Sequence, residues 1–215
     1  MDYNELIFFD LETSGLIPEE HDIIQIAAID AVTGDEFERY VRFKVGNASK
    51  AALEVNGYSE EVWDEKAVSQ REAFEAFREF VQAHAKQTRI SRRTGNEYKV
   101  AVMAGHNIDK FDMQFLKMWE QRLDGYLNID YACYDTLQLA RWLLPNIDTG
   151  YRLEELANYF KIAHGKSHNA LEDVRMNIQV AAKLVTLLTL EFLRWAKRVQ
   201  NKENEKFLIF FCFDA

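Results

Sequence analysis

Apolar residues recur along the chain in two periods, one typical of strands and the other of helices. Residues 6–13 read L-I-F-F-D-L-E-T, an apolar run that contains two acidic residues, and residues 22–30 form a second apolar run. After a T-G-D turn signal at residues 33–35, residues 37–45 alternate between apolar and polar positions. Three strands with short connections predict an antiparallel three-strand meander.

The rest of the chain alternates strands with helices. Ser69 and Glu72 have the spacing of a capping box, and the helix behind them places Phe74, Phe77 and Val81 on one face. The pattern then predicts strands over residues 99–104 and 131–136, and helices over residues 112–123, 136–144, 151–160 and 170–197. A meander followed by this alternation predicts the α/β class, with a mixed sheet of antiparallel and parallel strands flanked by helices.

The end of the sequence differs from the rest. Residues 1–200 form one predicted domain, and residues 201–215 form a separate tail that contains F-L-I-F-F-C-F at residues 207–213. This aromatic segment has the composition of a strand, which would promote aggregation if it were exposed. We therefore expect it to add an edge strand to the sheet or to contact another protein.

Composition narrows the class of protein. The chain has 215 residues, 48% of them hydrophobic and 28% charged, which is enough for one sizeable domain. No stretch reaches the roughly 18 consecutive apolar residues of a membrane helix, and the N-terminus lacks the pattern of a signal peptide. Cys133 and Cys212 match no metal-binding spacing. We expect a cytoplasmic protein with reduced thiols and no membrane partner.

The formal net charge is −9, which argues against a broad basic surface for nucleic acid. A local basic segment exists, because residues 84–99 carry five Lys or Arg residues and one Glu. A T-G-N turn signal at residues 94–96 predicts a hairpin within it. The segment is either a solvated loop or a surface that faces substrate. In the second case, Arg92 and Arg93 would bind the backbone of a nucleic acid.

Two acidic residues inside the first strand need an explanation. Asp10 and Glu12 point to the same face, since side chains alternate along a strand. Burying two like charges without a partner is costly, so an Arg, a Lys or a metal ion should lie between them. Asp112 and Asp173 each begin a predicted helix, where negative charge is favourable. Acids at strand ends and helix starts also gather at the crevice where α/β folds build their sites.

Several convergent carboxylates suit the hard cations Mg²⁺ and Mn²⁺. Two such ions about 3.5–4 Å apart can clamp a phosphodiester, one activating water and the other stabilising the leaving oxygen. This chemistry also needs a proton acceptor, and a histidine has an unperturbed pKa of about 6.5. His168 lies five residues before Asp173 and is the candidate. An ordinary surface or core histidine is the alternative.

Three stretches together resemble a known family. D-L-E-T-S-G-L at residues 10–16, H-N-x3-F-D at residues 106–112 and H-x-A-x2-D at residues 168–173 resemble the motifs of the DEDDh class of 3′-to-5′ exonucleases. This ribonuclease-H-like superfamily includes the proofreading subunit of the bacterial replicative polymerase. The similarity extends from about residue 6 to residue 180. Each motif is weak alone, but all three occur in order at predicted strand or helix boundaries.

The resemblance implies a ribonuclease-H-like fold and two-metal hydrolysis of nucleic acid from its 3′ end. The implied metal ligands and general base are Asp10, Glu12, Asp112, Asp173 and His168. The implied substrate-binding residues are Thr13, Ser14, Gly15, Leu16 and Asn107, with Leu16 as an apolar wedge against the terminal base. Asp109 is a rival to Asp112, but the Phe-Asp pair of the motif favours Asp112. A histidine at 168 argues against the sister class that uses tyrosine.

The substrate and the partners stay open at this point. Single-stranded DNA or frayed DNA ends are the first expectation, and the same chemistry on RNA is the nearest alternative, since contacts to the 2′-OH distinguish them. A non-catalytic binding module is a third possibility, but the five implied catalytic residues are all present. A proofreading or docking subunit, with Phe207–Phe213 bound to a polymerase, is a fourth. The sequence predicts no oligomeric state.

Overall fold

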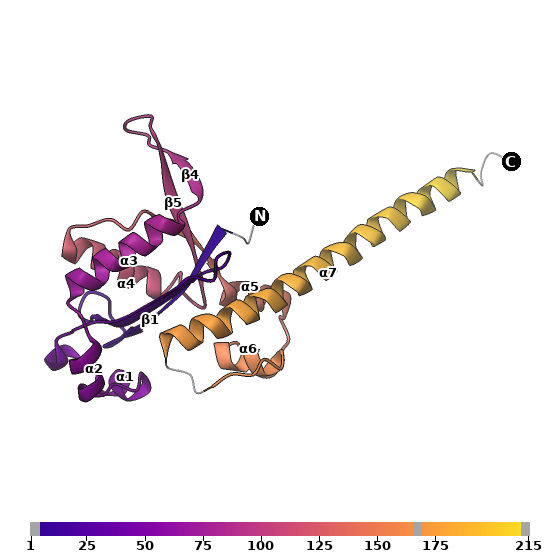
Figure 1. Cartoon of the computed structure of the whole chain (residues 1–215). Coiled ribbons are helices and arrows are strands. Elements are labelled where there is room, and N and C mark those ends of the chain that lie inside the picture. Colours follow the sequence, from indigo (N-terminus) through magenta and orange to yellow (C-terminus); the bar gives the residue numbers. More distant parts are fainter. Residues whose placement is uncertain (1–4, 166–168, 212–215) are drawn as a thin grey trace.

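A six-stranded mixed sheet forms the centre of the computed structural model, which describes residues 5–165 and 169–211, with side chains through residue 198 (Figure 1). The strands are β1 (Leu6–Thr13), β2 (Ile23–Asp30), β3 (Glu36–Tyr40), β4 (Gln87–Ile90), β5 (Glu97–Gly105) and β6 (Ile129–Asp135). The helices are α1 (Lys50–Val55), α2 (Glu60–Lys66), α3 (Gln70–His84), α4 (Asp112–Leu123), α5 (Thr136–Leu143), α6 (Leu153–Tyr159) and α7 (Ala170–Phe211), with a 3-10 turn at Val45–Asn47.

The strand order confirms the predicted mixed sheet. β1, β2 and β3 form the antiparallel meander, with Asp10 opposite Ala27 and Ala27 opposite Glu38. β5 pairs with β1 in parallel, with Phe8 opposite Ala104, and β6 pairs with β5 in parallel. β4 and β5 form the expected hairpin, whose turn contains Gly95 at a φ of 75°, a conformation that favours glycine.

The two faces of β1 belong to two separate parts of the core. Ile7, Phe9 and Leu11 pack in the larger core cluster, together with apolar side chains of α3 and α4. Leu6 and Phe8 pack on the other face, against the beginning of α7. Helices therefore cover both sides of this strand, as Figure 1 shows, and the even-numbered positions of β1 face α7.

The prediction for residues 37–45 is wrong at its end, because β3 stops at Tyr40. From there the chain turns toward the start of α3. Val41 forms a parallel bridge with Val68, and the N–H of Arg42 donates to the carbonyl of Val68. Two short helices, α1 and α2, follow and were not predicted. Each has only one or two turns, too few for a helical period to stand out in the sequence.

The long helix α7 extends beyond the predicted end near residue 197 and continues through Phe211. The expectation of a strand over residues 207–213 is therefore wrong for residues 207–211. No Pro or Gly interrupts residues 198–206, and Phe207, Phe210 and Phe211 have a helical spacing. Residues 212 and 213 lie outside the described part of the chain. Contact of this segment with another protein stays a prediction.

By length and mean hydropathy alone, residues Ala170–Arg198 of α7 could cross a membrane. The core helix of a globular domain passes the same test. Ala170, Val174 and Ala181 are buried against the sheet, so the first part of this segment is a core helix.

Candidate active site

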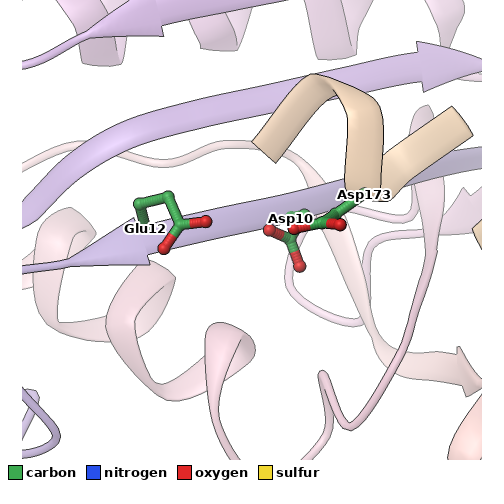
Figure 2. Close-up of side chains that lie close together, drawn as sticks. All are labelled: Asp10, Glu12 and Asp173. Atoms are coloured by element: carbon green, nitrogen blue, oxygen red, sulfur yellow. The ribbon is translucent and has the colours of Figure 1, made fainter. Parts of the chain in front are cut away.

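β1 and α7 bring three carboxylates together. Asp10 and Glu12 lie on the face of β1 that α7 covers, and Asp173 lies in the first turn of α7, where the helix dipole favours negative charge. One carboxylate oxygen of each residue lies within 4.8 Å of the other two. Figure 2 shows the three side chains beside the beginning of α7. The structure thus joins the first and third sequence motifs.

Asp112, the first residue of α4, adds a fourth carboxylate from the second motif. The backbone N–H of Leu11, which lies between Asp10 and Glu12, donates to Oδ1 of Asp112 over 3.2 Å. The Asp112 side chain is buried. The rival Asp109 lies elsewhere, with its Oδ2 3.5 Å from Nε2 of Gln138. The geometry therefore brings Asp112, and not Asp109, to β1.

Burial and mutual repulsion disfavour the charged forms of these carboxylates. Burial, followed by the charges of Asp173 and Asp112, raises the pKa of Glu12 to about 8. Burial also raises the pKa of Asp112 to about 7, although hydrogen bonds from backbone N–H groups oppose this shift. The pKa of Asp10 rises well above its ordinary value through burial and the charges of the other three acids. These are the shifts expected of buried like charges that lie close together.

The predicted alternative of a buried arginine is not met. Among the described residues, no Lys or Arg forms an ion pair with Asp10, Glu12 or Asp112. Carboxylate oxygens this close to one another are the donor set that a hard divalent cation prefers. The residues present therefore fit a divalent metal.

The sequence profile of the RNase_T exonuclease family matches residues 7–89 and 96–181, which include the sheet and the beginning of α7. The chain belongs to this exonuclease family. The two matched segments contain Asp10, Glu12, Asp112 and Asp173, and the gap between them falls in the β4–β5 turn. The family assignment and the acidic cluster thus agree on the same part of the molecule.

Curated relatives and solved structures extend this assignment. The PolC-type DNA polymerase III of Pediococcus pentosaceus is 30% identical over 170 residues, and that of Caldanaerobacter subterraneus is 27% identical over 187 residues. These matches cover 78% and 86% of the exonuclease chain, but only 10% and 12% of the polymerases. The chain therefore spans about a tenth of the length of these relatives.

Among solved structures, Escherichia coli exonuclease I in complex with a dA16 oligonucleotide matches with a TM-score of 0.64 and 21% identity. The match covers 84% of this chain and 40% of that one. The zinc-bound form of an exonuclease I–single-stranded DNA complex from the same organism matches with a TM-score of 0.67, 20% identity and coverage of 88% and 42%. The two structures share the fold of this exonuclease.

The predicted substrate loop follows Glu12 directly. Thr13 and Ser14 are buried, and Asn56 donates from Nδ2 to the carbonyl of Thr13 over 2.8 Å. Gly15 leaves room for the His21 ring, since a Cβ atom there would lie 2.1 Å from it. Leu16, in contrast, is 77% exposed. The loop thus has a fixed base and a free apolar tip, which fits the predicted wedge.

Asn107 follows β5 in a left-handed conformation, with a φ of 65°. Its N–H donates to Oδ1 of Asp135 over 2.9 Å, so the carboxylate at the end of β6 fixes this turn. The neighbouring His106 lies between the Thr136 hydroxyl at 3.0 Å and the Tyr151 carbonyl at 2.9 Å. Burial lowers the pKa of His106, which makes it a neutral structural group.

A cavity of about 620 Å³ borders Asn107 and was not anticipated from the sequence. Its lining residues are His106, Asn107, Leu137, Arg141, Tyr151, Arg152, Leu153 and Glu155. The two arginines form no ion pair with any described residue, and Arg141 lies 5.9 Å from the centre of the Tyr151 ring.

The structure does not bring Arg92 and Arg93 to the acidic cluster. Both lie in the β4–β5 turn, ahead of β5, while the carboxylates lie near the end of the parallel strand β1. Nine residues of β5 separate the two ends, a length of about 30 Å at 3.3 Å per residue. Figure 1 shows the hairpin extending away from the sheet. Only a long substrate could reach both places, and this contact stays a prediction.

His168 lies outside the described residues, so its role as general base also stays a prediction. The structure does place its neighbour. Oδ1 of Asn169 accepts the N–H of Glu172 over 3.2 Å, and the Asn169 carbonyl accepts the N–H of Asp173 over 3.0 Å. Asn169 thus caps α7 one residue after His168.

Proposed function

We propose that the chain is a 3′-to-5′ exonuclease that removes nucleotides from single-stranded DNA or frayed DNA ends. One observation carries the proposal. Carboxylates from β1, α4 and α7 converge on one place in an exonuclease fold, and no described cation balances Asp10, Glu12 or Asp112. Hydrolysis of a phosphodiester is the chemistry that such a site performs when it holds metal ions.

Two divalent ions, Mg²⁺ or Mn²⁺, are the proposed cofactors, held by Asp10, Glu12, Asp112 and Asp173. When bound, they would activate water and stabilise the leaving oxygen. The raised pKa values of Glu12 and Asp112 mean that part of the site is protonated near neutral pH without metal. Metal binding therefore releases protons, and affinity should increase with pH.

The other proposed roles belong to the chain itself. His168 would accept the proton of the attacking water, because its unperturbed pKa suits that task at neutral pH. Thr13, Ser14 and Gly15 would form the loop around the terminal nucleotide, and Leu16 would stack against its base. Asn107, which borders the arginine-lined cavity, would contact the nucleic-acid strand behind the terminal nucleotide.

DNA is the proposed substrate because the polymerase relatives act on DNA by name and exonuclease I is solved with DNA oligonucleotides. RNA is the alternative, and it would require donors or acceptors for the 2′-OH near the terminal sugar. Cys133 is a free thiol, which fits a reducing compartment such as the cytoplasm.

A proofreading or docking role is the second candidate, and the similarity to polymerases favours it. In that case, Phe207–Phe213 would bind a polymerase. Pull-down with the full chain and with a chain ending at residue 200 tests the idea. Loss of a polymerase from the shortened bait is expected, and identical partners would contradict it.

The direct test follows 5′-labelled single-stranded DNA and RNA of one sequence with Mg²⁺, Mn²⁺ or EDTA. Wild type should give a metal-dependent ladder that shortens from the 3′ end, and Asp10→Ala and His168→Ala should not. The faster substrate decides between DNA and RNA. Intact substrate in every wild-type lane would reject the exonuclease proposal in favour of a binding module.

A further inference from the structure

The loop between β1 and β2, residues 14–22, is closed on itself by hydrogen bonds. At its base, the N–H of Ser14 donates to the Asp22 carbonyl over 2.8 Å, and the N–H of Asp22 donates to Oγ of Ser14 over 2.9 Å. Within it, the N–H groups of Glu20 and His21 donate to the Ile17 carbonyl. This closed loop carries the exposed apolar tip, with Leu16 77% and Ile17 45% exposed.

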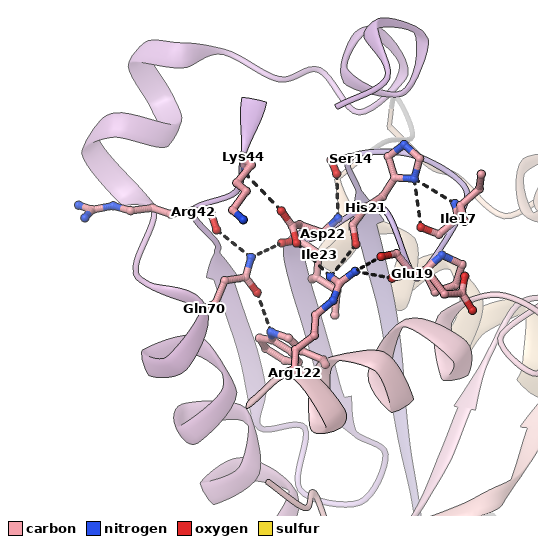
Figure 3. A network of polar contacts seen from close by, with 12 residues as sticks. Ser14, Ile17, Glu19, His21, Asp22, Ile23, Arg42, Lys44, Gln70 and Arg122 are labelled. Carbon is pink, nitrogen blue, oxygen red and sulfur yellow. Dashed lines mark hydrogen bonds and ion pairs between the residues drawn. The ribbon is translucent and has the colours of Figure 1, made fainter. Parts of the chain in front are cut away.

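One side chain from a distant part of the sequence holds the loop. Arg122 donates from Nη1 to the His21 carbonyl over 2.9 Å and to Oδ1 of Asp22 over 3.1 Å. From Nη2 it donates to the carbonyls of Pro18 and Glu19, both over 2.8 Å. Figure 3 shows the guanidinium reaching from its helix into the loop. Three backbone carbonyls and one carboxylate thus converge on one guanidinium.

This arrangement requires arginine in particular. A guanidinium presents donors in a rigid planar fork, whereas the lysine ammonium directs its three donors from a single point. Without the guanidinium, the three carbonyl oxygens would lose this shared donor, and the Asp22 carboxylate would keep the N–H of Lys44, which donates to its Oδ2 over 3.3 Å. Water would replace the lost donor at these exposed groups, and the loop would no longer be tied to α4.

The helix that carries Arg122 also carries a site carboxylate. Asp112 is the first residue of α4, and Arg122 lies in its last turn. Ten residues of α-helix span about 15 Å. One rigid helix therefore connects the acidic cluster to the loop whose tip would meet the terminal base.

We propose that Arg122 is a positioning residue of the exonuclease, which holds Leu16 at a fixed place relative to the site carboxylates and so seats the 3′-terminal base. This inference rests on the proposed function, because it takes Leu16 as the group that stacks on that base. Arg122 does not touch the substrate. It acts through the loop of residues 14–22.

The test is a double-mutant cycle with Arg122→Ala and Leu16→Ala, measured as kcat and KM on 5′-labelled single-stranded DNA. Each single variant should raise KM about tenfold, within the range for losing one stacked base. kcat at saturating substrate should stay within about twofold, because the carboxylates are untouched. Combining the two changes should raise KM no further than Leu16→Ala alone. Arg122→Lys should also raise KM, which keeps the test decisive if the alanine variant does not fold.

Amide hydrogen exchange without substrate separates this inference from the proposed function. Arg122→Ala should speed exchange at Glu20 and His21, while the matched control Arg78→Ala should not. The Arg78 side chain is 37% exposed and pairs with Glu75 in its own helix, and it forms no other ion pair with a described residue. If exchange is faster in Arg122→Ala but wild type does not degrade DNA, Arg122 holds the loop and the proposed nuclease activity is rejected. The role of Arg122 would be overturned by unchanged amide exchange in Arg122→Ala or by additive effects of the two substitutions on KM. A fall in kcat as large as the rise in KM would overturn it too.

Discussion

Asp30 and Glu12 are both buried carboxylates on the β1–β2 pair, but their surroundings differ completely. The Asp30 side chain has no exposed surface, and it accepts hydrogen bonds from Lys86 at 2.8 Å and from the N–H groups of Val32 and Thr33. Burial disfavours its charge, but these bonds outweigh burial and lower its pKa. Glu12 has no such ion pair among the described residues, and its pKa rises to about 8.

The difference separates an acid that stabilises the fold from the acids that we propose bind metal. At Asp30 the chain supplies its own cation, so the charge is satisfied when the protein folds. At Asp10, Glu12 and Asp112 the chain supplies further negative charge instead. Such a cluster lowers stability until a cation arrives from solution.

The largest expected effect comes from Glu12→Gln. Exonuclease activity should fall by about 10³-fold or more, equivalent to roughly 4 kcal/mol, because the amide is a poor metal ligand. The metal-free variant should melt no lower than wild type, since one repelling charge is gone. Steady-state kinetics and thermal melting in EDTA measure both quantities. Activity close to that of wild type would contradict the binding role of Glu12.

Asp30→Ala should show the opposite behaviour. We expect the free energy of unfolding to fall by about 3 kcal/mol, because Lys86 and two N–H groups lose their partner. kcat should stay close to wild type. Urea denaturation measures the loss, and the variant Lys86→Met, which leaves Asp30 buried without its cation, serves as the comparison. A stable but inactive Asp30→Ala protein would contradict the distinction between Asp30 and the acids of the site.

Metal addition should stabilise the folded protein by about 2.7 kcal/mol when the free ion is at 100 times its dissociation constant. The increase should appear in thermal melts with Mn²⁺ or Mg²⁺ and disappear in Asp10→Asn. Asp30→Ala should keep the increase, because its carboxylate is not part of the site. Equal stabilisation of wild type and Asp10→Asn would mean that the ion binds elsewhere.

The smallest effect is a pH dependence of the metal-free protein. Raised pKa values mean that the folded state keeps protons on Glu12 and Asp112 that the unfolded state has lost. The contribution of these two protonated acids to the free energy of unfolding is therefore fully present below about pH 4 and is lost as pH rises through about 7 to 8. Between pH 5 and pH 8 we expect wild type to lose stability relative to Glu12→Gln at the same pH. A flat difference between the two proteins would show that Glu12 titrates normally.

The pattern of apolar residues predicted the elements that are long enough to place several side chains in the core. β1 and α4 begin and end where the sequence indicated, because most of β1 is apolar and α4 carries Phe115, Leu116 and Trp119 at a helical spacing. α1 and α2 were missed because each is too short to establish a period. The end of α7 was misjudged because aromatic composition outweighed the helical spacing of Phe207 and Phe211.

The same contrast holds for the site. The four acids could be predicted because each sits in a short recognisable stretch, Asp10 and Glu12 inside a strand and Asp112 and Asp173 at the beginning of a helix. Arg122 was not, because its partners lie about 100 residues earlier in the chain and no local period connects them. Its role follows only from the folded structure. The cavity around Arg141 and Arg152 was missed for a related reason, since it forms between α5, α6 and the turn after β5.

Asp10 and Asp173 lie side by side in the folded protein, yet 163 positions separate them along the chain. During synthesis, the first carboxylates are made early and the last one only after most of the domain has been translated. A nascent chain, or one cut off by an early stop codon, therefore lacks at least one of the carboxylates that we propose bind metal. On the proposed function, such fragments should not cleave nucleic acid.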